Sequence, residues 1–289
     1  EDKFQAYVID PSVHEYLEGR TPNPCVNCNT FLKFDHLFTK MKELGCDYLA
    51  TGHYVQTGVV DGDKSVLIKG RDPIKDQSYF LFTIPKEYLK NLLFPVGDMT
   101  KDEVRKHAER FGLLNARKKD SQEICFVSSK GYAKFIESRV GEDLLHKGGD
   151  IILLPSGKKI GTHDGIHGYT IGQRRGLGLD HHEPLFVIKV DSKKGEVHVG
   201  PETLLFAREI KKKNINWMLG SNSNLAGNDE DLTVKIRYRH GGARAKLLPQ
   251  DDGSLKVHFT EPQRAVTPGQ AAVFYKDDVM IGGGWITEV

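Results

Sequence analysis

The residues of this sequence best suited to covalent chemistry are Cys25 and Cys28, in the stretch TPNPCVNCN. Pro22 and Pro24 fix the backbone, and they predict that a helix begins only after Asn29. Cys28 would then lie just ahead of a helix N-terminus, where unpaired backbone N–H groups favour a thiolate. The pattern therefore makes Cys28 a candidate nucleophile.

A Cys-x-x-Cys pair also has other ordinary meanings. It can be half of a zinc site, which would need two further ligands, or a redox dithiol, or two unrelated core thiols. Of the remaining cysteines, we expect Cys46 to be an inert buried thiol near a strand entry. Cys125 becomes functional only as a partner of Cys28, so the spacing alone leaves these alternatives open.

A second polar motif, DPIKDQSYF from residue 72, precedes a segment expected to be an apolar strand, residues 79–84. It can be a solvated turn, or a loop in which Lys75 meets a phosphate while Asp76 and Gln77 make directed hydrogen bonds. The stretch 161–178 is rich in glycine and arginine, which suits either a nucleic-acid backbone or the turns of a small β domain. The sequence contains no P-loop and no G-x-G-x-x-G run, so its motifs do not establish nucleotide binding.

Alternating helices and strands are expected to position these residues over the first 130 positions. Apolar residues at helical spacing predict a helix over 31–44 that stops at Gly45. Residues 47–54 and 121–127 are expected to be strands, with Cys125 near the end of the second. This alternation is typical of an α/β portion.

One further helix has clear boundary signals. Thr100 and Glu103 form a capping box, and Gly112 is the expected C-terminal cap. Between them, Val104 and Ala108 form part of an apolar stripe, which continues to Phe111.

From about residue 148 the hydrophobic period changes to two, which indicates β structure. The turns at 191–195 and 251–253 predict two hairpins. Over 232–239, apolar residues alternate with polar ones, so one face of the strand is expected to be basic. Three lysines at 211–213 and the polar stretch 221–231 suggest a loop-rich junction.

Composition bounds the protein class. The 289 residues hold 41 Lys and Arg against 39 Asp and Glu, 38% are hydrophobic, and no apolar run approaches the length of a membrane span. Four cysteines are too few for a disulfide scaffold, which favours a reducing, cytoplasmic setting without a membrane. The first residues, EDKF, show neither an initiator Met nor a secretory signal, as in a fragment of a longer chain.

Five separated motifs resemble those of the tRNA-specific 2-thiouridylases, in the same order and at similar spacing. They are GRTPNPCVNCN from residue 19, ATGHY from 50, KDQS from 75, SQEICF from 121 and the glycine-rich stretch 163–178. The likeness extends to TPGQA from residue 267, close to the C-terminus. It implies an α/β catalytic portion like the adenine nucleotide alpha hydrolases over 1–130, a small, mostly β, tRNA-binding domain over 131–204 and a C-terminal β-barrel over 205–289.

The resemblance implies an ATP-dependent sulfur insertion at C2 of the wobble uridine, in the anticodon stem-loop of tRNA. ATP, with Mg²⁺, is the co-substrate, and AMP and pyrophosphate are released. Cys125 would accept sulfur from a sulfur-donor relay protein and hold it as a persulfide. Cys28 would be the second catalytic cysteine, and turnover would leave a Cys28–Cys125 disulfide for a reductant to reopen.

The resemblance also assigns binding residues. Gly52 would lie at the adenine nucleotide. The residues placed against tRNA are Asn23, Pro24, Cys25, His53, Lys75, Asp76, Gln77, Arg237, Tyr238 and Gln270. A uridine modified at C2 must leave its stack, so a snug base pocket is expected.

Two features depart from the family pattern. The sequence begins after the point where the S-G-G-x-D-S loop for pyrophosphate belongs, which implies a truncated enzyme with an incomplete sheet. Cys25 stands where some relatives carry Asp, so Cys25, Cys28 and Cys125 could instead hold an iron–sulfur cluster. A cluster-dependent thiolase, a zinc protein and a non-catalytic tRNA-binding fragment are therefore the alternative interpretations.

Overall fold

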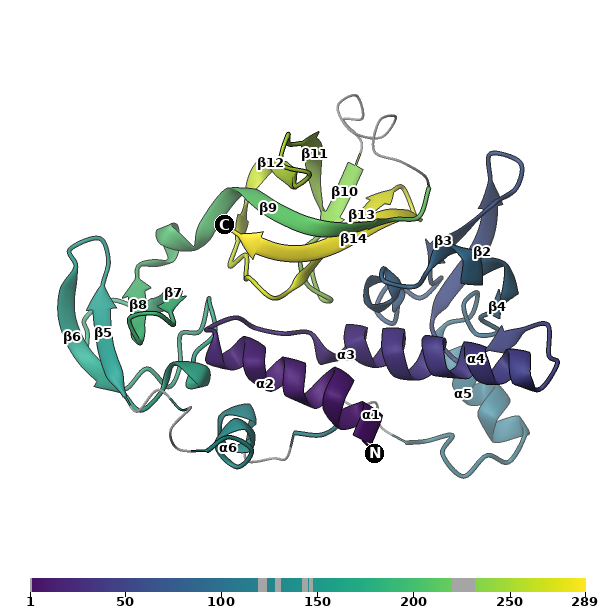
Figure 1. The fold of residues 1–289 in the computed structure, drawn as a ribbon, viewed down its shortest axis with the longest axis horizontal. Helices are drawn as coiled ribbons and strands as arrows, with labels where there is room; N and C mark the ends of the chain where they lie inside the picture. The colour runs from purple at the N-terminus through teal and green to yellow at the C-terminus, as the bar shows by residue number, and fades with distance from the viewer. Residues whose placement is uncertain (1, 119–123, 128–130, 142–144, 146–147, 220–231) are drawn as a thin grey trace.

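The computed structural model describes residues 2–118, 124–127, 131–141, 145, 148–219 and 232–289. Figure 1 shows a helical portion along one side, a β-barrel above it and a four-stranded sheet at one end. The predicted class is confirmed: an α/β portion precedes a small β domain and a C-terminal barrel. None of the helices that the structure describes has the length and apolar character needed to cross a bilayer.

Two helical segments open the chain, and each contains a π-helical stretch. The first consists of α1 (Asp2–Phe4), η1 (Gln5–Ile9) and α2 (Asp10–Leu17). The second consists of α3 (Pro24–Asn27), η2 (Cys28–Asp35) and α4 (His36–Glu43), and it runs beneath the barrel (Figure 1).

The second segment begins earlier than predicted. Pro24 occupies its first turn, where a missing backbone N–H leaves no helical hydrogen bond unmade. The prediction that Cys28 lies ahead of the helix N-terminus is therefore wrong, because Cys28 lies inside the helix. Gly45 adopts a φ of +66°, as expected for the residue that ends a helix.

The α/β portion contains a small parallel sheet in which β1 (Leu49–Ala50) pairs with β4 (Leu92–Leu93). Only two of the residues 47–54 are therefore in a strand. The strand expected over 79–84 is wrong, since η3 (Ser78–Leu81) is a 3-10 turn, and a second one, η4 (Lys86–Asn91), follows. Of the strand expected over 121–127, the described residues 124–127 form a turn, and 121–123 lie outside the description.

The capping box is confirmed at the start of α5 (Lys101–Arg110), where the Thr100 side chain accepts from the Glu103 backbone N–H. Gly112 ends the helix with a φ of +65°. Its apolar stripe is not buried: no residue of α5 is buried, and Phe111 is 67% exposed.

The C-terminal strands form a closed barrel of six: β9 (Phe206–Trp217), β10 (Leu232–Lys235), β11 (Ala243–Pro249), β12 (Leu255–Arg264), β13 (Ala271–Lys276) and β14 (Val279–Glu288). The hairpin predicted at 251–253 joins β11 to β12. Leu232, Val234 and Ile236 are buried in the core of the barrel, as the alternation predicted.

The loop expected at the three lysines is wrong, because residues 211–213 belong to β9. The Lys212 side chain is fully buried inside the barrel, and its Nζ donates to the carbonyl oxygens of Ala272 and Gly284, each at 2.6 Å. Because successive side chains of a strand point to opposite faces, Lys212 points into the barrel while its two neighbouring lysines point outward.

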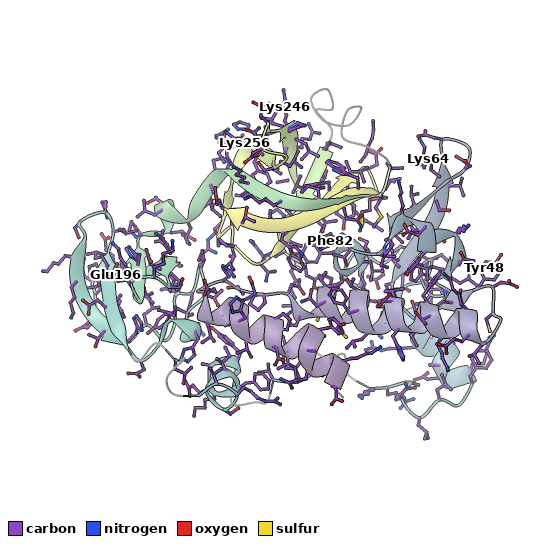
Figure 2. The ribbon with its side chains drawn as sticks, viewed as in Figure 1. Tyr48, Lys64, Phe82, Glu196, Lys246 and Lys256 are labelled. Atoms are coloured by element: carbon purple, nitrogen blue, oxygen red, sulfur yellow. The ribbon has the colours of Figure 1, made fainter. Side chains whose placement is uncertain are left out.

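The α/β portion and the barrel share a sheet and a core. The hairpin of β2 (Val55–Val60) and β3 (Lys64–Lys69) joins the barrel through β14. Phe82 fills the space between the two parts, with its ring 5.5 Å from that of Trp285 (Figure 2). The Asn216 side chain donates to the carbonyl oxygens of Phe82 and Ile84, which ties β9 to this segment.

The central domain follows α6 (Tyr132–Glu137). Its strands β5 (Gly149–Leu153), β6 (Lys158–His163), β7 (Phe186–Asp191) and β8 (Glu196–Gly200) form a sheet of order β6-β5-β8-β7. The hairpin predicted at 191–195 joins β7 to β8. Short 3-10 turns, η5 (Ile166–Gly168) and η6 (Glu202–Leu205), complete the described elements. Tyr16 of α2 stacks on Tyr132 with ring centres 4.7 Å apart, which joins the first helices to α6.

Candidate active site and tRNA-binding surface

The structure brings three cysteines from two distant segments into one neighbourhood. Cys25 lies in α3 and Cys28 begins η2. The turn 124–127 lies near the start of α3, since Ile124 and Phe126 line a small apolar cavity together with Pro24. Cys125 in that turn is close enough for its charge to act on both other thiols.

Two opposing influences act on the pKa values of Cys25 and Cys28. Burial raises the pKa of the Cys25 and Cys28 thiols, and the neighbouring Cys125 raises both further. The Lys33 ammonium acts in the other direction and lowers both pKa values. Because burial is the largest cause, the net effect on Cys25 and Cys28 is a pKa above that of an ordinary thiol.

All four cysteines are free thiols in this structure. Cys46 is exposed, so the expectation of a buried thiol is wrong. It lies in the turn after α4, outside the apolar face of that helix. The predicted Cys28–Cys125 disulfide is not formed here, which leaves both sulfur atoms available for exchange.

The three thiols do not fit a metal cluster as they are placed. Across the described residues, no three His, Cys, Asp or Glu side chains gather closely enough to hold a metal ion. An iron–sulfur cluster would need Cys25, Cys28 and Cys125 as ligands at one point.

His53 is a buried, uncharged side chain behind the cysteine helix. Its Nδ1 lies 2.8 Å from the Thr51 hydroxyl and its Nε2 lies 3.2 Å from Asn29 Oδ1. These partners fit a neutral ring in which Nε2–H donates to the amide oxygen and Nδ1 accepts from the hydroxyl. Burial, reinforced by Lys33, lowers the pKa of His53 to about 4. The imidazole therefore positions Asn29 of η2 against the β1 edge.

The His53 environment makes protein stability depend on pH. The unfolded imidazole titrates near its ordinary value and the folded one near 4, so the unfolded state binds more protons between these values. We expect the free energy of unfolding to fall by about 1.5 kcal/mol from pH 6.5 to pH 5, relative to a His53→Gln variant. Urea titrations at each pH measure this. Equal pH slopes for the two proteins would contradict the assignment, and the exposed His182→Gln variant is the matched control.

Gly52 lies at the carboxyl end of β1, next to Thr51, whose backbone N–H donates to the Leu93 carbonyl oxygen. It is exposed, and a Cβ added there would meet no atom within 4 Å. This edge of a parallel sheet is where α/β proteins bind ligands.

The barrel positions the residues that lead into the cysteine helix. The Gln270 side chain donates to the carbonyl oxygens of Thr21 and Pro22, at 2.9 and 3.1 Å. Gly269 has a φ of +89°, and a Cβ there would approach the Thr21 carbonyl oxygen to 2.9 Å. Gln270 is therefore occupied in holding the backbone just before Asn23.

Asn23 and Arg237 meet around a buried tyrosine. The Tyr79 hydroxyl donates to the Ala271 carbonyl oxygen at 3.0 Å and also hydrogen-bonds to the Asn23 side chain. Arg237 acts electrostatically on Tyr79 and donates from Nη1 to the Arg264 carbonyl oxygen at 3.1 Å. Arg237 is exposed at the surface.

A large basic cleft of about 1160 Å³ lies between the α/β portion and the barrel. Loop 70–77 forms one wall and the segment after β10 forms the other. Its lining cations are Lys69, Arg71, Lys75, Lys101, Lys235 and Arg239, joined by His240. Gln77 and Tyr238 also line it, so four of the residues expected at tRNA, Lys75, Asp76, Gln77 and Tyr238, face one cleft.

Asp76 stabilises the loop that forms one wall of this cleft. Its side chain is buried and accepts from the backbone N–H groups of Gly70 and Ser78 and from the Ser78 hydroxyl. Its Oδ2 lies 3.6 Å from the largely buried Nζ of Lys235 across the cleft. The carboxylate is therefore committed to shaping the loop that presents Lys75.

Sequence reasoning missed two functional features of this site. Lys33 was not singled out, because its relation to Cys28 depends on the helix type. The second is the pairing of Asp76 with Lys235, which are far apart along the chain. The motif DPIKDQS indicated Asp76, but no motif indicated Lys235.

Three family models match consecutive parts of the chain. Residues 1–129 match the tRNA methyl transferase HUP domain, residues 133–201 the tRNA methyl transferase PRC-barrel domain and residues 207–286 the aminomethyltransferase beta-barrel domain.

Several curated proteins are similar along nearly the whole chain, and each bears the name tRNA-specific 2-thiouridylase MnmA. The protein of Geotalea uraniireducens is 48% identical over 286 residues, covering 99% of this chain and 74% of that relative. The Geobacter metallireducens protein is 46% identical, covering 99% of this chain and 76% of its own length. The Rickettsia bellii protein is 46% identical, with 99% and 77% covered. Given this identity and the three matched domains, the chain belongs to the tRNA-specific 2-thiouridylase family.

Proposed function

We propose that the protein replaces the C2 oxygen of the wobble uridine of tRNA by sulfur, with ATP as co-substrate. The observation that supports this best is the proximity of Cys28 and Cys125, from segments almost 100 residues apart, at one surface. The α/β portion that carries these thiols also forms one wall of the basic cleft. A thiol pair and a cleft suited to a polyanion in one protein fit sulfur transfer to a nucleic acid.

In this proposal, Cys125 receives a sulfane sulfur from a donor protein and becomes a persulfide. The Cys28 thiol loses its proton, and its sulfur attacks the inner sulfur of Cys125, which forms a disulfide and expels hydrosulfide. The hydrosulfide adds to C2 of the uridine, whose oxygen leaves with the adenylate as AMP. ATP supplies that leaving group, with release of pyrophosphate. An external dithiol then returns both cysteines to thiols.

The protein residues around the thiols have defined tasks in this scheme. Gln270 and Gly269 fix the backbone before Asn23, so the first turn of α3 faces the base. Neutral His53 anchors Asn29 and thereby the turn that carries Cys28. Gly52 leaves room for the nucleotide at the end of β1.

The proposal is tested by incubating the full-length protein with tRNA, ATP and a persulfide donor, and measuring 2-thiouridine and pyrophosphate. Formation of both in equal amounts is the expected result. Stable tRNA binding without either product would instead support a non-catalytic tRNA-binding role.

Arg237→Ala tests the tRNA surface. Because Arg237 is an exposed cation of the barrel, we expect Arg237→Ala to weaken binding to all cognate tRNAs and to reduce the salt slope by about one. Filter binding over a series of salt concentrations gives both quantities. Arg208→Ala is a matched control, since Arg208 is also exposed and also donates to a barrel carbonyl, that of Thr260. Unchanged affinity and slope for Arg237→Ala would exclude it as a phosphate contact.

A further inference from the structure

The helix type around Cys28 determines which side chains lie beside its thiol. Residues Cys28–Asp35 form the π-helix η2. In an α-helix, residues five apart point in directions roughly 140° apart. In a π-helix, hydrogen bonds join residues five apart, so such residues lie on neighbouring turns of the same face. The π stretch therefore brings Lys33 onto the face of Cys28.

Lys33 differs from the other lysines of this helical segment. Lys40 pairs with Glu43 at 2.9 Å, and the Lys42 ammonium lies over the Phe38 ring at 5.7 Å. Lys33 has no carboxylate partner among the residues that the structure describes, and its charge acts on Cys25, Cys28 and His53. Its side chain is exposed, so it can also approach an anion formed at the surface.

The other groups facing Cys28 add no positive charge. Cys25 precedes it in α3, and Cys125 approaches from the turn 124–127. His53, which lies 3.2 Å from the side chain of Asn29, the residue after Cys28, is a neutral imidazole. Lys33 is thus the cation available to balance a negative charge on the Cys28 sulfur within this part of the described structure.

We propose that Lys33 is a positioning residue for sulfur transfer, whose ammonium, brought into place by the π-helix, stabilises the anionic sulfur of Cys28. This inference rests on the proposed function for its biological meaning. Its physical content is independent of tRNA and ATP, because it concerns how readily one thiol loses its proton.

The direct test is the rate of iodoacetamide alkylation of Cys28 between pH 6 and pH 10, in a Cys25→Ser background. In this reaction the thiolate displaces iodide, so the rate follows the thiolate fraction. Peptide mass spectrometry quantifies Cys28, with exposed Cys46 as the internal reference. We expect Lys33→Met to slow alkylation of Cys28 at pH 8 by about threefold or more and to move the profile to higher pH.

Two further variants separate the effect of the Lys33 charge from other effects of substitution. Lys33→Arg retains the charge and should retain most of the rate. Lys42→Met removes a charge from the same helical segment and should leave Cys28 unaffected. Equal profiles for wild type and Lys33→Met, or equal losses in Lys33→Met and Lys42→Met, would overturn the proposal.

Thiolation kinetics separate this inference from the proposed function. Lys33→Met should lower kcat with little change in tRNA affinity. Loss of affinity with kcat unchanged would make Lys33 a phosphate contact and overturn its role at sulfur. Thiolation that survives Cys28→Ser would reject the proposed function instead, whatever the alkylation profile of Lys33→Met shows.

Discussion

Replacing either Cys28 or Cys125 by Ser should reduce tRNA thiolation to background, a loss of about 10³-fold or more, while tRNA affinity stays nearly unchanged. A hydroxyl can neither carry a sulfane sulfur nor close a disulfide, so each change removes a reacting atom. Neither side chain lines the basic cleft, so binding should persist. Single-turnover thiolation and filter binding on the same preparations measure the two quantities.

The remaining cysteines provide matched controls for this result. Cys46→Ser alters an exposed thiol in the turn after α4 and should leave thiolation unchanged. Cys25→Ser should retain activity in a two-thiol mechanism, because Cys25 exchanges no sulfur. Activity that survives Cys28→Ser or Cys125→Ser would contradict the mechanism, and complete loss in Cys25→Ser would favour a three-cysteine site.

Asp76→Asn should lower the free energy of unfolding by about 3 to 5 kcal/mol, the usual cost of leaving one partner of a buried ion pair uncompensated. The change removes the charge opposite Lys235 and places an amide in a site lined by donors from Gly70 and Ser78. Urea titration gives the stability. Because the loop presents Lys75 and Gln77, tRNA affinity should fall as well.

The cause of that loss can be isolated with Lys235. In a double-mutant cycle, adding Lys235→Met to Asp76→Asn should recover part of the stability, because no buried charge is left unpaired. Asp278→Ala is the control, since its partner Lys69 forms an exposed pair and the change should cost less than about 1 kcal/mol. A cost for Asp76→Asn as small as that of Asp278→Ala would show that Asp76 does not brace the cleft.

Local patterns in the sequence predicted the regular elements of the barrel and of the central domain. Alternation over 232–239 identified a core-facing strand, although β10 ends at Lys235 and Ile236 is buried just beyond it. The turn residues at 191–195 and 251–253 located both hairpins. The capping box at Thr100 located the start of α5. In each case the deciding interaction lies within a few residues along the chain.

The errors occurred where distant contacts determine the structure. Residues 79–84 are as apolar as a strand, yet Ser78–Leu81 form a 3-10 turn and Phe82, just after it, packs against Trp285 of the barrel. Pro24 looked like a barrier to a helix, but it occupies the first turn, where proline is tolerated. Lys212 looked like part of a polar loop, while two carbonyl groups of other strands hold its ammonium inside the barrel.

In the candidate site, too, local patterns identified some residues and distant contacts determined the rest. Motifs identified Cys28, Cys125 and the loop 72–77, but no local pattern could show that Asp76 faces Lys235 or that Gln270 holds Pro22. The relation of Lys33 to Cys28 was hidden by the helix type, since five-residue spacing does not place side chains together in an ordinary α-helix.

In the proposed mechanism, Cys28 and Cys125 exchange sulfur with each other during transfer to tRNA. Mapping the cysteines after one turnover without reductant, using the persulfide-loaded full-length protein, ATP and tRNA, tests this exchange. We expect one Cys28–Cys125 disulfide for each 2-thiouridine formed, with Cys25 and Cys46 still free. Stoichiometric 2-thiouridine with Cys28 and Cys125 both recovered as free thiols would contradict it.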